Sequence, residues 1–172
     1  MTESKITIHL PDVESTMKLG STLASFFRER KTQIPLFMNG DLGSGKTTLV
    51  RAMVESLPGA QNAEVSSPSF NILNIYPTTP QVNHFDLYRL EGQIPDDEFF
   101  DLLNNKKTLT VVEWIQYLRV DFWPDSALLF TWIPAASGRT IELTLHGSTT
   151  SLFEELASHL KSFQQLPLNT CS

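Results

Sequence analysis

The amino-acid sequence predicts an α/β fold, in which a mixed central β-sheet of about seven strands carries helices on both faces. Over residues 6–57, segments with the alternating pattern of a strand take turns with segments of helical spacing. After residue 70, strand patterns follow one another across turns rich in Pro and Gly, which favours hairpins and therefore a mixed sheet. For 172 residues that are 41% hydrophobic, we expect one domain over residues 1–163 and a disordered tail over residues 164–172.

The first half of the chain contains two strands, each followed by a helix. Apolar and polar residues alternate over residues 6–10, which predicts a half-buried strand. Asp12 is a suitable cap for a helix from Val13 to about Arg30. We expect the buried face of that helix to contain Val13, Met17, Gly20, Leu23, Ala24 and Phe27. The apolar run 34–39 predicts a second strand, and residues 46–57 predict a second helix.

Two further strands and a short helix are predicted in the middle of the chain. Residues 70–76 and 82–88 have strand character and are joined by a Pro-containing turn at residues 77–80, so we expect an antiparallel pair. The acidic segment 96–103 has apolar residues at helical spacing and predicts a short helix.

The remaining elements are a buried strand, a hairpin and a last helix. The β-branched apolar run 109–112 is typical of a strand buried on both faces, and it ends at Glu113. Residues 128–133 and 140–145 predict a hairpin. A final amphipathic helix begins after Thr149 or Thr150.

Residues 40–47, with the sequence GDLGSGKT, match the phosphate-loop pattern G-x-x-x-x-G-K-S/T. The glycines allow successive backbone N–H groups to point at phosphate oxygens. Lys46 then reaches the β- and γ-phosphates, and the Thr47 hydroxyl ligates Mg²⁺. The alternative is a glycine-rich turn without chemical function. An apolar strand before the loop and a helix after it favour a nucleotide site, because the phosphates then lie at a helix N-terminus.

Hydrolysis of a bound nucleotide also requires a carboxylate near the magnesium ion or the attacking water. Glu113 is the leading candidate, because parallel strands carry ligand-binding residues at their carboxyl ends. The alternative is that Glu113 only marks the point where its strand meets solvent.

The segment His84-Phe85-Asp86-Leu87-Tyr88-Arg89 is the second candidate constellation. On a strand, His84, Asp86 and Tyr88 share one face while Phe85 and Leu87 share the other. Asp86 could then hold a metal-bound water or orient Lys46, and His84 could hydrogen-bond a neighbouring loop. A solvated face of an edge strand is the competing interpretation.

Ser66, Ser67 and Ser69 flank Pro68 at a place where many nucleotide hydrolases keep a loop that senses the γ-phosphate, although a serine-rich turn has other uses. The segment Asn105-Lys106-Lys107-Thr108 resembles the guanine-recognition element N-K-x-D but ends in Thr instead of the carboxylate. We therefore expect adenine in preference to guanine.

The composition limits the classes of function. A net charge of -6 and an isoelectric point near 5.1 argue against direct binding of nucleic acid, so any contact with RNA is expected to be indirect. The single cysteine, Cys171, excludes an internal disulfide and suits a reducing, cytoplasmic location. No apolar run approaches the length of a membrane span, so we expect no membrane association.

Taken together, the phosphate loop, Ser66-Ser67-Pro68-Ser69-Phe70, the His84–Arg89 segment and Val112-Glu113-Trp114 occur in the order of one family. The chain resembles TsaE, also called YjeE, the small bacterial ATPase needed for threonylcarbamoyladenosine (t6A) modification of tRNA. This resemblance implies a P-loop NTPase fold that binds ATP and Mg²⁺. It further implies that Thr47 and Glu113 approach the metal, that Asp86 is a functional acid, and that Ser67, Ser69 and His84 belong to a switch region.

The resemblance also implies a set of nucleotide-binding residues and a set of partners. The nucleotide-binding residues would be Asp41, Leu42, Gly43, Ser44, Gly45, Lys46, Thr47, Thr48, Thr16 and Arg139. Proteins of this family act on the TsaB–TsaD heterodimer, whose TsaD subunit modifies adenosine 37 of tRNAs that read ANN codons. The chain departs from the family pattern at Ser69, where Thr is frequent, and at Ile115 and Gln116, where Pro and an acidic residue are usual.

The sequence thus predicts an ATPase of weak intrinsic rate that depends on a protein partner, with Glu113, Asp86 and Lys46 as its catalytic residues. A small-molecule kinase shares the loop but needs an acceptor pocket and usually an Arg-rich lid, and the six Arg of this chain form no cluster. A nucleotide-gated binding module without useful catalysis is the other alternative. Trp114 is expected to pack in the core, with a contact to the nucleotide or partner as the alternative.

Overall fold

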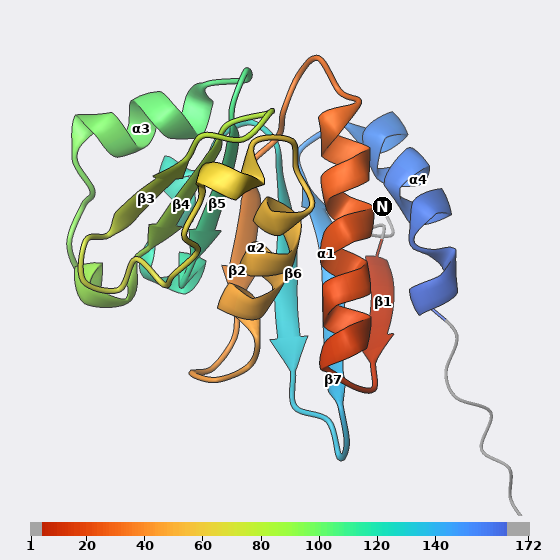
Figure 1. Cartoon of the computed structure of the whole chain (residues 1–172). Helices are drawn as coiled ribbons and strands as arrows, with labels where there is room; N and C mark the ends of the chain where they lie inside the picture. Colours follow the sequence, from red (N-terminus) through yellow and green to blue (C-terminus); the bar gives the residue numbers. More distant parts are fainter. Residues whose placement is uncertain (1–4, 165–172) are drawn as a thin grey trace, which may run out of the picture.

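The computed structural model describes residues 5–164, and in it seven strands form one twisted sheet (Figure 1). The strands are β1 (Lys5–Leu10), β2 (Leu36–Asn39), β3 (Leu73–Tyr76), β4 (Val82–Asp86), β5 (Leu109–Glu113), β6 (Ala127–Ile133) and β7 (Arg139–His146). The helices are α1 (Val13–Arg28), α2 (Lys46–Glu55), α3 (Asp97–Asn104) and α4 (Thr150–His159). The mixed α/β sheet of seven strands that the sequence predicts is confirmed.

The centre of the sheet is parallel and its edges are antiparallel. The spatial order is β1-β7-β6-β2-β5-β4-β3, in which β2 runs parallel to both β5 and β6, and β4 runs parallel to β5. The pairs β3–β4 and β6–β7 are antiparallel, as expected for the two predicted hairpins, and β1 also pairs with β7 in the antiparallel direction. Because β2, β4 and β5 are parallel neighbours, their carboxyl ends lie side by side at one edge of the sheet.

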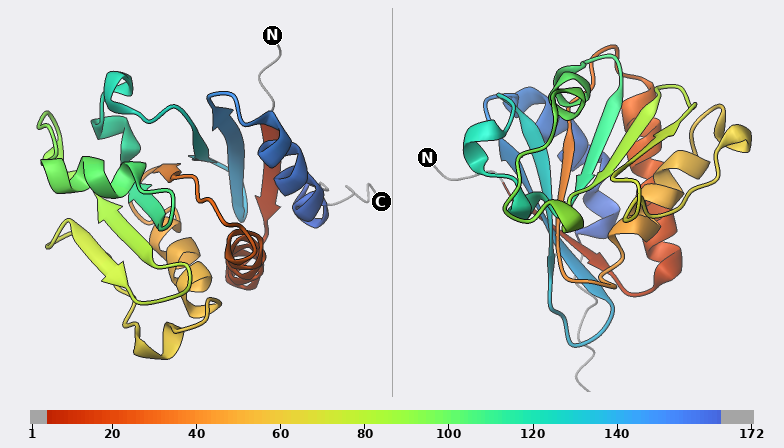
Figure 2. Two further views of the ribbon diagram at one scale, coloured as in Figure 1. Left: turned by 90° about the horizontal axis from the view of Figure 1, so that it is seen from above. Right: turned by 90° about the vertical axis from the view of Figure 1, so that its left-hand side faces the viewer.

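Helices cover both faces of the sheet (Figure 2). Helices α1, α2 and α4 share one hydrophobic core with the inward residues of β1, β2, β5, β6 and β7. Helix α3 closes a second core on the opposite face, where Phe99 and Leu103 pack with Phe37, Phe85 and Val112. Every residue of β4 and β5 is buried, so the β4 face that carries His84 and Asp86 is not the solvated face of an edge strand.

Helix α1 begins as predicted, but its buried face is rotated. The side chain of Asp12 accepts a hydrogen bond from the backbone N–H of Ser15, which confirms the predicted cap. Val13 and Met17, however, are 55% and 37% exposed. The buried residues are Thr16, Leu19, Gly20, Leu23, Ala24, Phe26 and Phe27. The centre of the buried face is displaced toward Leu19 and Phe26, so Met17 falls at its margin and Val13 lies in the exposed first turn.

Strand β3 is shorter than predicted, since it begins at Leu73 and not at Phe70. Ile72 has a φ of 67°, a left-handed conformation that β-branched residues rarely adopt, and Phe70 is 79% exposed. Strand β4 likewise ends at Asp86, because the Asp86 carboxylate accepts a hydrogen bond from the backbone N–H of Tyr88 and turns the chain. Tyr88 therefore lies in a short 3₁₀ turn after the strand and not on it.

The predicted tail over residues 164–172 lies, apart from Gln164, outside the described residues. A single sheet runs through the described part of the chain, and the one-domain arrangement over residues 1–163 stays a prediction. Within residues 5–164 there is no helix with the length and apolar character needed to cross a membrane.

Candidate functional site

The phosphate loop lies between β2 and α2, at the edge of the sheet where the parallel strands end (Figure 1). Gly45, the residue before α2, has a φ of 108°, which only glycine adopts without strain. A Cβ atom at this position would also lie 2.8 Å from Arg139 Nε. The glycine therefore serves both the turn into the helix and the close approach of Arg139.

A cavity of about 430 Å³ opens beside the loop. Its lining consists of Leu42, Gly43, Ser44, Gly45, Lys46, Thr47, Thr48, Ser67, Ser69, Asp86, Tyr88, Arg89, Glu113, Trp114 and Arg139. The volume is within the range of small-molecule sites. Most of the residues that the sequence predicts for nucleotide and metal binding thus line one cavity, although they come from distant parts of the chain.

Lys46 is folded back onto its own loop. Its Nζ donates hydrogen bonds to the carbonyl oxygens of Gly40 at 2.6 Å and Asp41 at 2.9 Å. Burial lowers the pKa of the Lys46 ammonium, and the charges of Glu113, Asp86 and Asp41 act against that decrease. A buried ammonium that is only partly compensated by the protein favours an anionic ligand.

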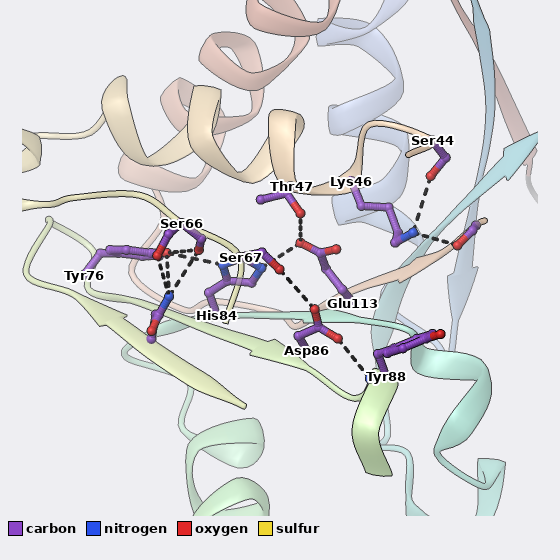
Figure 3. A network of polar contacts seen from close by, with 12 residues as sticks. Ser44, Lys46, Thr47, Ser66, Ser67, Tyr76, His84, Asp86, Tyr88 and Glu113 are labelled. Atoms are coloured by element: carbon purple, nitrogen blue, oxygen red, sulfur yellow. Dashed lines mark hydrogen bonds and ion pairs between the residues drawn. The ribbon is translucent and has the colours of Figure 1, made fainter. Parts of the chain in front are cut away.

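Glu113 lies directly beneath the loop, at the end of β5, and is 2% exposed (Figure 3). Its Oε1 accepts a hydrogen bond from Thr47 Oγ1 at 2.9 Å and lies 2.8 Å from His84 Nε2. The Thr47 hydroxyl donates this hydrogen bond to Glu113, so the lone pairs of its oxygen remain available to a cation. Glu113 is therefore part of the loop's hydrogen-bond network, and it is not a residue that merely marks a strand end.

Asp86 lies beside Glu113, because the register of β4 and β5 pairs these two residues. Its Oδ2 accepts a hydrogen bond from Ser67 Oγ at 3.2 Å, and its Oδ1 accepts one from the backbone N–H of Tyr88 at 2.9 Å. Asp86 makes no hydrogen bond with Lys46 among the described contacts. Of the two predicted uses of Asp86, contact with a metal-bound water is compatible with this geometry.

His84 is fully buried and does not line the cavity. It lies behind Glu113 and is connected through Tyr76 to the serine-containing loop of residues 65–70, called the 65–70 loop below. The Tyr76 hydroxyl is 3.4 Å from His84 Nδ1 and donates a hydrogen bond to the Ser66 carbonyl oxygen at 3.0 Å. Burial raises the pKa of the Tyr76 hydroxyl. Tyr76 was not predicted as a residue of this network. Tyr76 lies two residues after Asn74, and Asn74 pairs with His84 across β3 and β4. Residues two apart on a strand share a face, so this spacing was the signal that could have identified Tyr76.

Trp114 packs in the core, as expected, and also lies beside the candidate nucleotide site, which was the alternative. It is 9% exposed and stacks on Tyr117, as expected for a core residue. It also lines the cavity, and Lys46 Nζ lies 4.2 Å from the centre of its ring. A left-handed backbone conformation, with a φ of 60°, turns the chain after Glu113 and brings the indole over Lys46. Such strain in a non-glycine residue is common at functional sites.

The remaining predicted nucleotide-binding residues do not all line this cavity. Arg139 lines the cavity and its Nε donates to the Ser44 carbonyl oxygen at 2.7 Å. Asp41 lines a neighbouring hollow on the other side of the loop. Thr16 is buried in the first turns of α1, where its hydroxyl contacts the Asp12 carbonyl oxygen, and it does not line the cavity. The Asn105–Thr108 segment precedes β5, at the opposite end of that strand from Glu113.

The donor set fits a hard cation. Within residues 5–164, no group of three or more His, Cys, Asp or Glu side chains is arranged to hold a metal ion by itself. Mg²⁺ is usually bound by one or two carboxylates together with substrate phosphates and waters. Thr47 and Glu113, adjacent to the phosphate loop, provide this kind of incomplete oxygen set.

Comparison with known proteins relates the chain to one family. The family model described as "Threonylcarbamoyl adenosine biosynthesis protein TsaE" matches residues 10–141. A protein of Streptomyces coelicolor, named tRNA threonylcarbamoyladenosine biosynthesis protein TsaE, is 34% identical over 145 residues, which cover 82% of this chain and 93% of that protein. The protein of the same name from Haemophilus influenzae is 32% identical over 115 residues, covering 63% and 70% of the two chains.

Among solved structures, the one titled "Crystal structure of Bacillus subtilus YdiB" has a TM-score of 0.71 at 24% identity. The superposition covers 92% of this chain and 98% of that chain, so the two proteins share their fold. The fold is that of a P-loop NTPase-like α/β protein.

Proposed function

The chain belongs to the TsaE family, and from this premise we propose that it is an ATPase that acts in t6A modification of tRNA by binding and hydrolysing ATP with Mg²⁺. The observation that carries the proposal is the hydrogen bond between Thr47 and Glu113, which joins the phosphate loop to a buried carboxylate from a distant strand. A loop that only bound phosphate would not require that carboxylate.

The proposed roles follow from the contacts. Backbone N–H groups of residues 43–47 and the ammonium of Lys46 bind the phosphates, and Lys46 exchanges its contacts with Gly40 and Asp41 for phosphate oxygens. Thr47 and Glu113 would hold the metal, which would supply positive charge to the phosphates. Asp86 would orient a water at that metal, and Ser67 and Ser69, which line the cavity, would form the loop that responds to the γ-phosphate.

We propose the TsaB–TsaD heterodimer as the partner and the cytoplasm as the location. The relatives are named for t6A biosynthesis, which supports a role beside the transferase that makes this modification. The acidic net charge of -6 supports indirect contact with tRNA, held by the partner. Adenine is proposed as the base, because the segment that resembles a guanine reader precedes β5 at the strand end remote from the loop.

Measurement of ATP turnover with and without the TsaB–TsaD complex tests the proposal. We expect slow hydrolysis by the chain alone, and association with the complex in ATP but not in its absence. A kinase would consume ATP in step with a phosphorylated acceptor, and a binding module would consume almost none. Failure to associate with the complex in either condition would refute the proposed partner.

Replacement of Glu113 by Ala tests the carboxylate. We expect Glu113→Ala to retain nucleotide binding better than hydrolysis, because the loop and Lys46 still contact the phosphates. Hydrolysis by Glu113→Ala at the wild-type rate would show that this carboxylate is not part of the reaction.

A further inference from the structure

A chain of polar contacts connects the 65–70 loop to Glu113 through the interior of the protein (Figure 3). It starts at the Ser66 carbonyl oxygen, which accepts from Tyr76 OH at 3.0 Å. Tyr76 OH lies 3.4 Å from His84 Nδ1, and His84 Nε2 lies 2.8 Å from Glu113 Oε1. The three side chains come from β3, β4 and β5, which are neighbours in the sheet.

These groups are buried, and burial makes their arrangement specific. The exposed fractions are 3% for Tyr76, 0% for His84 and 2% for Glu113. A buried donor or acceptor that loses its partner costs about 1–3 kcal/mol. When one member moves, its neighbour must therefore move or find another partner, since water has little access.

The contacts leave one carboxylate oxygen of Glu113 for other uses. Both Thr47 and His84 contact Oε1, and Oε2 makes no hydrogen bond with any residue in the described range 5–164. The imidazole thus restricts the rotation of the carboxylate and determines which oxygen is directed elsewhere. His84 does not line the cavity, so it acts on a ligand there only through Glu113.

The loop has a second connection to the same region. Ser67 donates to Asp86, which pairs with Glu113 across β4 and β5. The 65–70 loop is joined to β3 through Ile72, which has a left-handed backbone conformation. The carbonyl oxygen of Ile72 accepts a hydrogen bond from the backbone N–H of Asp86, which helps to hold that conformation. Ser67 and Ser69 also line the cavity, so a ligand that displaces the loop disturbs both links.

We propose that Tyr76 and His84 are positioning residues that hold the Glu113 carboxylate and couple its orientation to the conformation of the 65–70 loop. Occupation of the cavity at Ser67 and Ser69 is thereby transmitted to the carboxylate that contacts Thr47. This inference rests on the proposed function, because it takes Glu113 as a residue that holds the metal ion of a bound nucleotide.

The variant Tyr76→Phe tests the coupling, because it removes the hydroxyl and retains the ring. ADP affinity is measured by calorimetry with Mg²⁺ and with excess chelator. We expect Tyr76→Phe to weaken binding with Mg²⁺ about threefold to tenfold, because His84 loses the one hydrogen bond that links it to the hydroxyl. Binding without metal should be unchanged. Tyr117→Phe is the matched control, because the Tyr117 hydroxyl makes no hydrogen bond among the described contacts and does not line the cavity.

A double-mutant cycle shows whether the effect passes through the carboxylate. In a Glu113→Gln background, Tyr76→Phe should have no further effect on the binding of ADP with Mg²⁺. The variant His84→Gln retains an N–H group near the position of Nε2 and should bind better than His84→Leu. Equal losses with and without Mg²⁺, or an undiminished loss in the Glu113→Gln background, would refute the coupling.

Hydrogen exchange in the nucleotide-free protein separates this inference from the proposed function. We expect Tyr76→Phe and His84→Gln to increase amide exchange over residues 65–72, and Tyr117→Phe to leave it unchanged. If the wild type binds no nucleotide, the proposed function fails while the exchange data still test the relay. If exchange in the loop is the same in all variants, the relay is refuted even when the wild type hydrolyses ATP.

Discussion

The close crossing of α1 and α2 gives a prediction about the helix that carries the phosphate-binding residues. Gly20 of α1 lies against the middle of α2, which begins with Lys46 and Thr47. A Cβ atom on Gly20 would lie 2.3 Å from the Cβ of Ala52 and 3.0 Å from the backbone C of Ala52 and the backbone N of Met53. None of these atoms can rotate away, so Gly20→Ala must move the two helices apart.

The size of the effect follows from the distances. Carbon atoms in ordinary contact are about 3.5–4.0 Å apart, so the helices must separate locally by roughly 1 Å. Overpacking of a core costs about 1–3 kcal/mol, and the upper part of that range applies because the contact is with backbone. Ala is better than Gly in a helix by about 1 kcal/mol, which leaves a net loss of about 2 kcal/mol. For a chain of this length, that loss lowers Tm by about 4–8 °C.

Thermal denaturation followed by circular dichroism is the assay, and Ala52→Gly supplies the compensating change. Ala52→Gly alone should destabilise the protein by about 1 kcal/mol, because it places glycine inside a helix. The double variant Gly20→Ala/Ala52→Gly should lose less stability than the two single variants added together, because the methyl group is moved from α2 to α1 and the clash between the two Cβ atoms is absent. A Tm for Gly20→Ala equal to or above that of the wild type, or strict additivity in the double variant, would refute the account of this crossing.

Three further predictions concern the cavity. Lys46→Ala should abolish detectable nucleotide binding in calorimetry, because it removes the ammonium that two loop carbonyls now hold, while circular dichroism should remain that of a folded protein. The lowered pKa of Lys46 means that the unfolded chain binds more protons between that pKa and the ordinary value of 10.5, so stability rises with pH in this window. The stability of the wild type relative to Lys46→Met, measured by urea denaturation without nucleotide, should therefore increase from pH 7 to pH 10, and a constant difference would contradict the burial of the charge. Arg139→Ala removes the hydrogen bond to the Ser44 carbonyl oxygen, and we expect ADP affinity to fall about tenfold, the worth of one charge-assisted bond. An unchanged affinity would show that Arg139 does not support the loop.

Local patterns were sufficient to predict most of the elements and the phosphate loop. The residues of that loop are consecutive, and the strand before it and the helix after it have their own periodicities. The errors occurred where periodicity alone cannot decide. Val13 and Met17 fit the helical spacing of α1, but the position of α2 against Gly20 and of β1 beneath the helix sets which stripe is buried. Phe70 fits a strand pattern, but the left-handed Ile72 separates it from β3.

The sequence by itself determined that the chain has a mixed α/β fold with a phosphate loop between a strand and a helix, and it named Glu113 and Asp86 as candidate acids. These features depend on interactions between residues that are near one another along the chain. Only the tertiary structure decided that Glu113 meets Thr47 across 66 positions, that Asp86 pairs with Glu113, and that Tyr76 joins His84 to the 65–70 loop. Strand order and register place these groups together, and both result from the packing of two sheet faces against helices from the whole chain, which no local pattern contains.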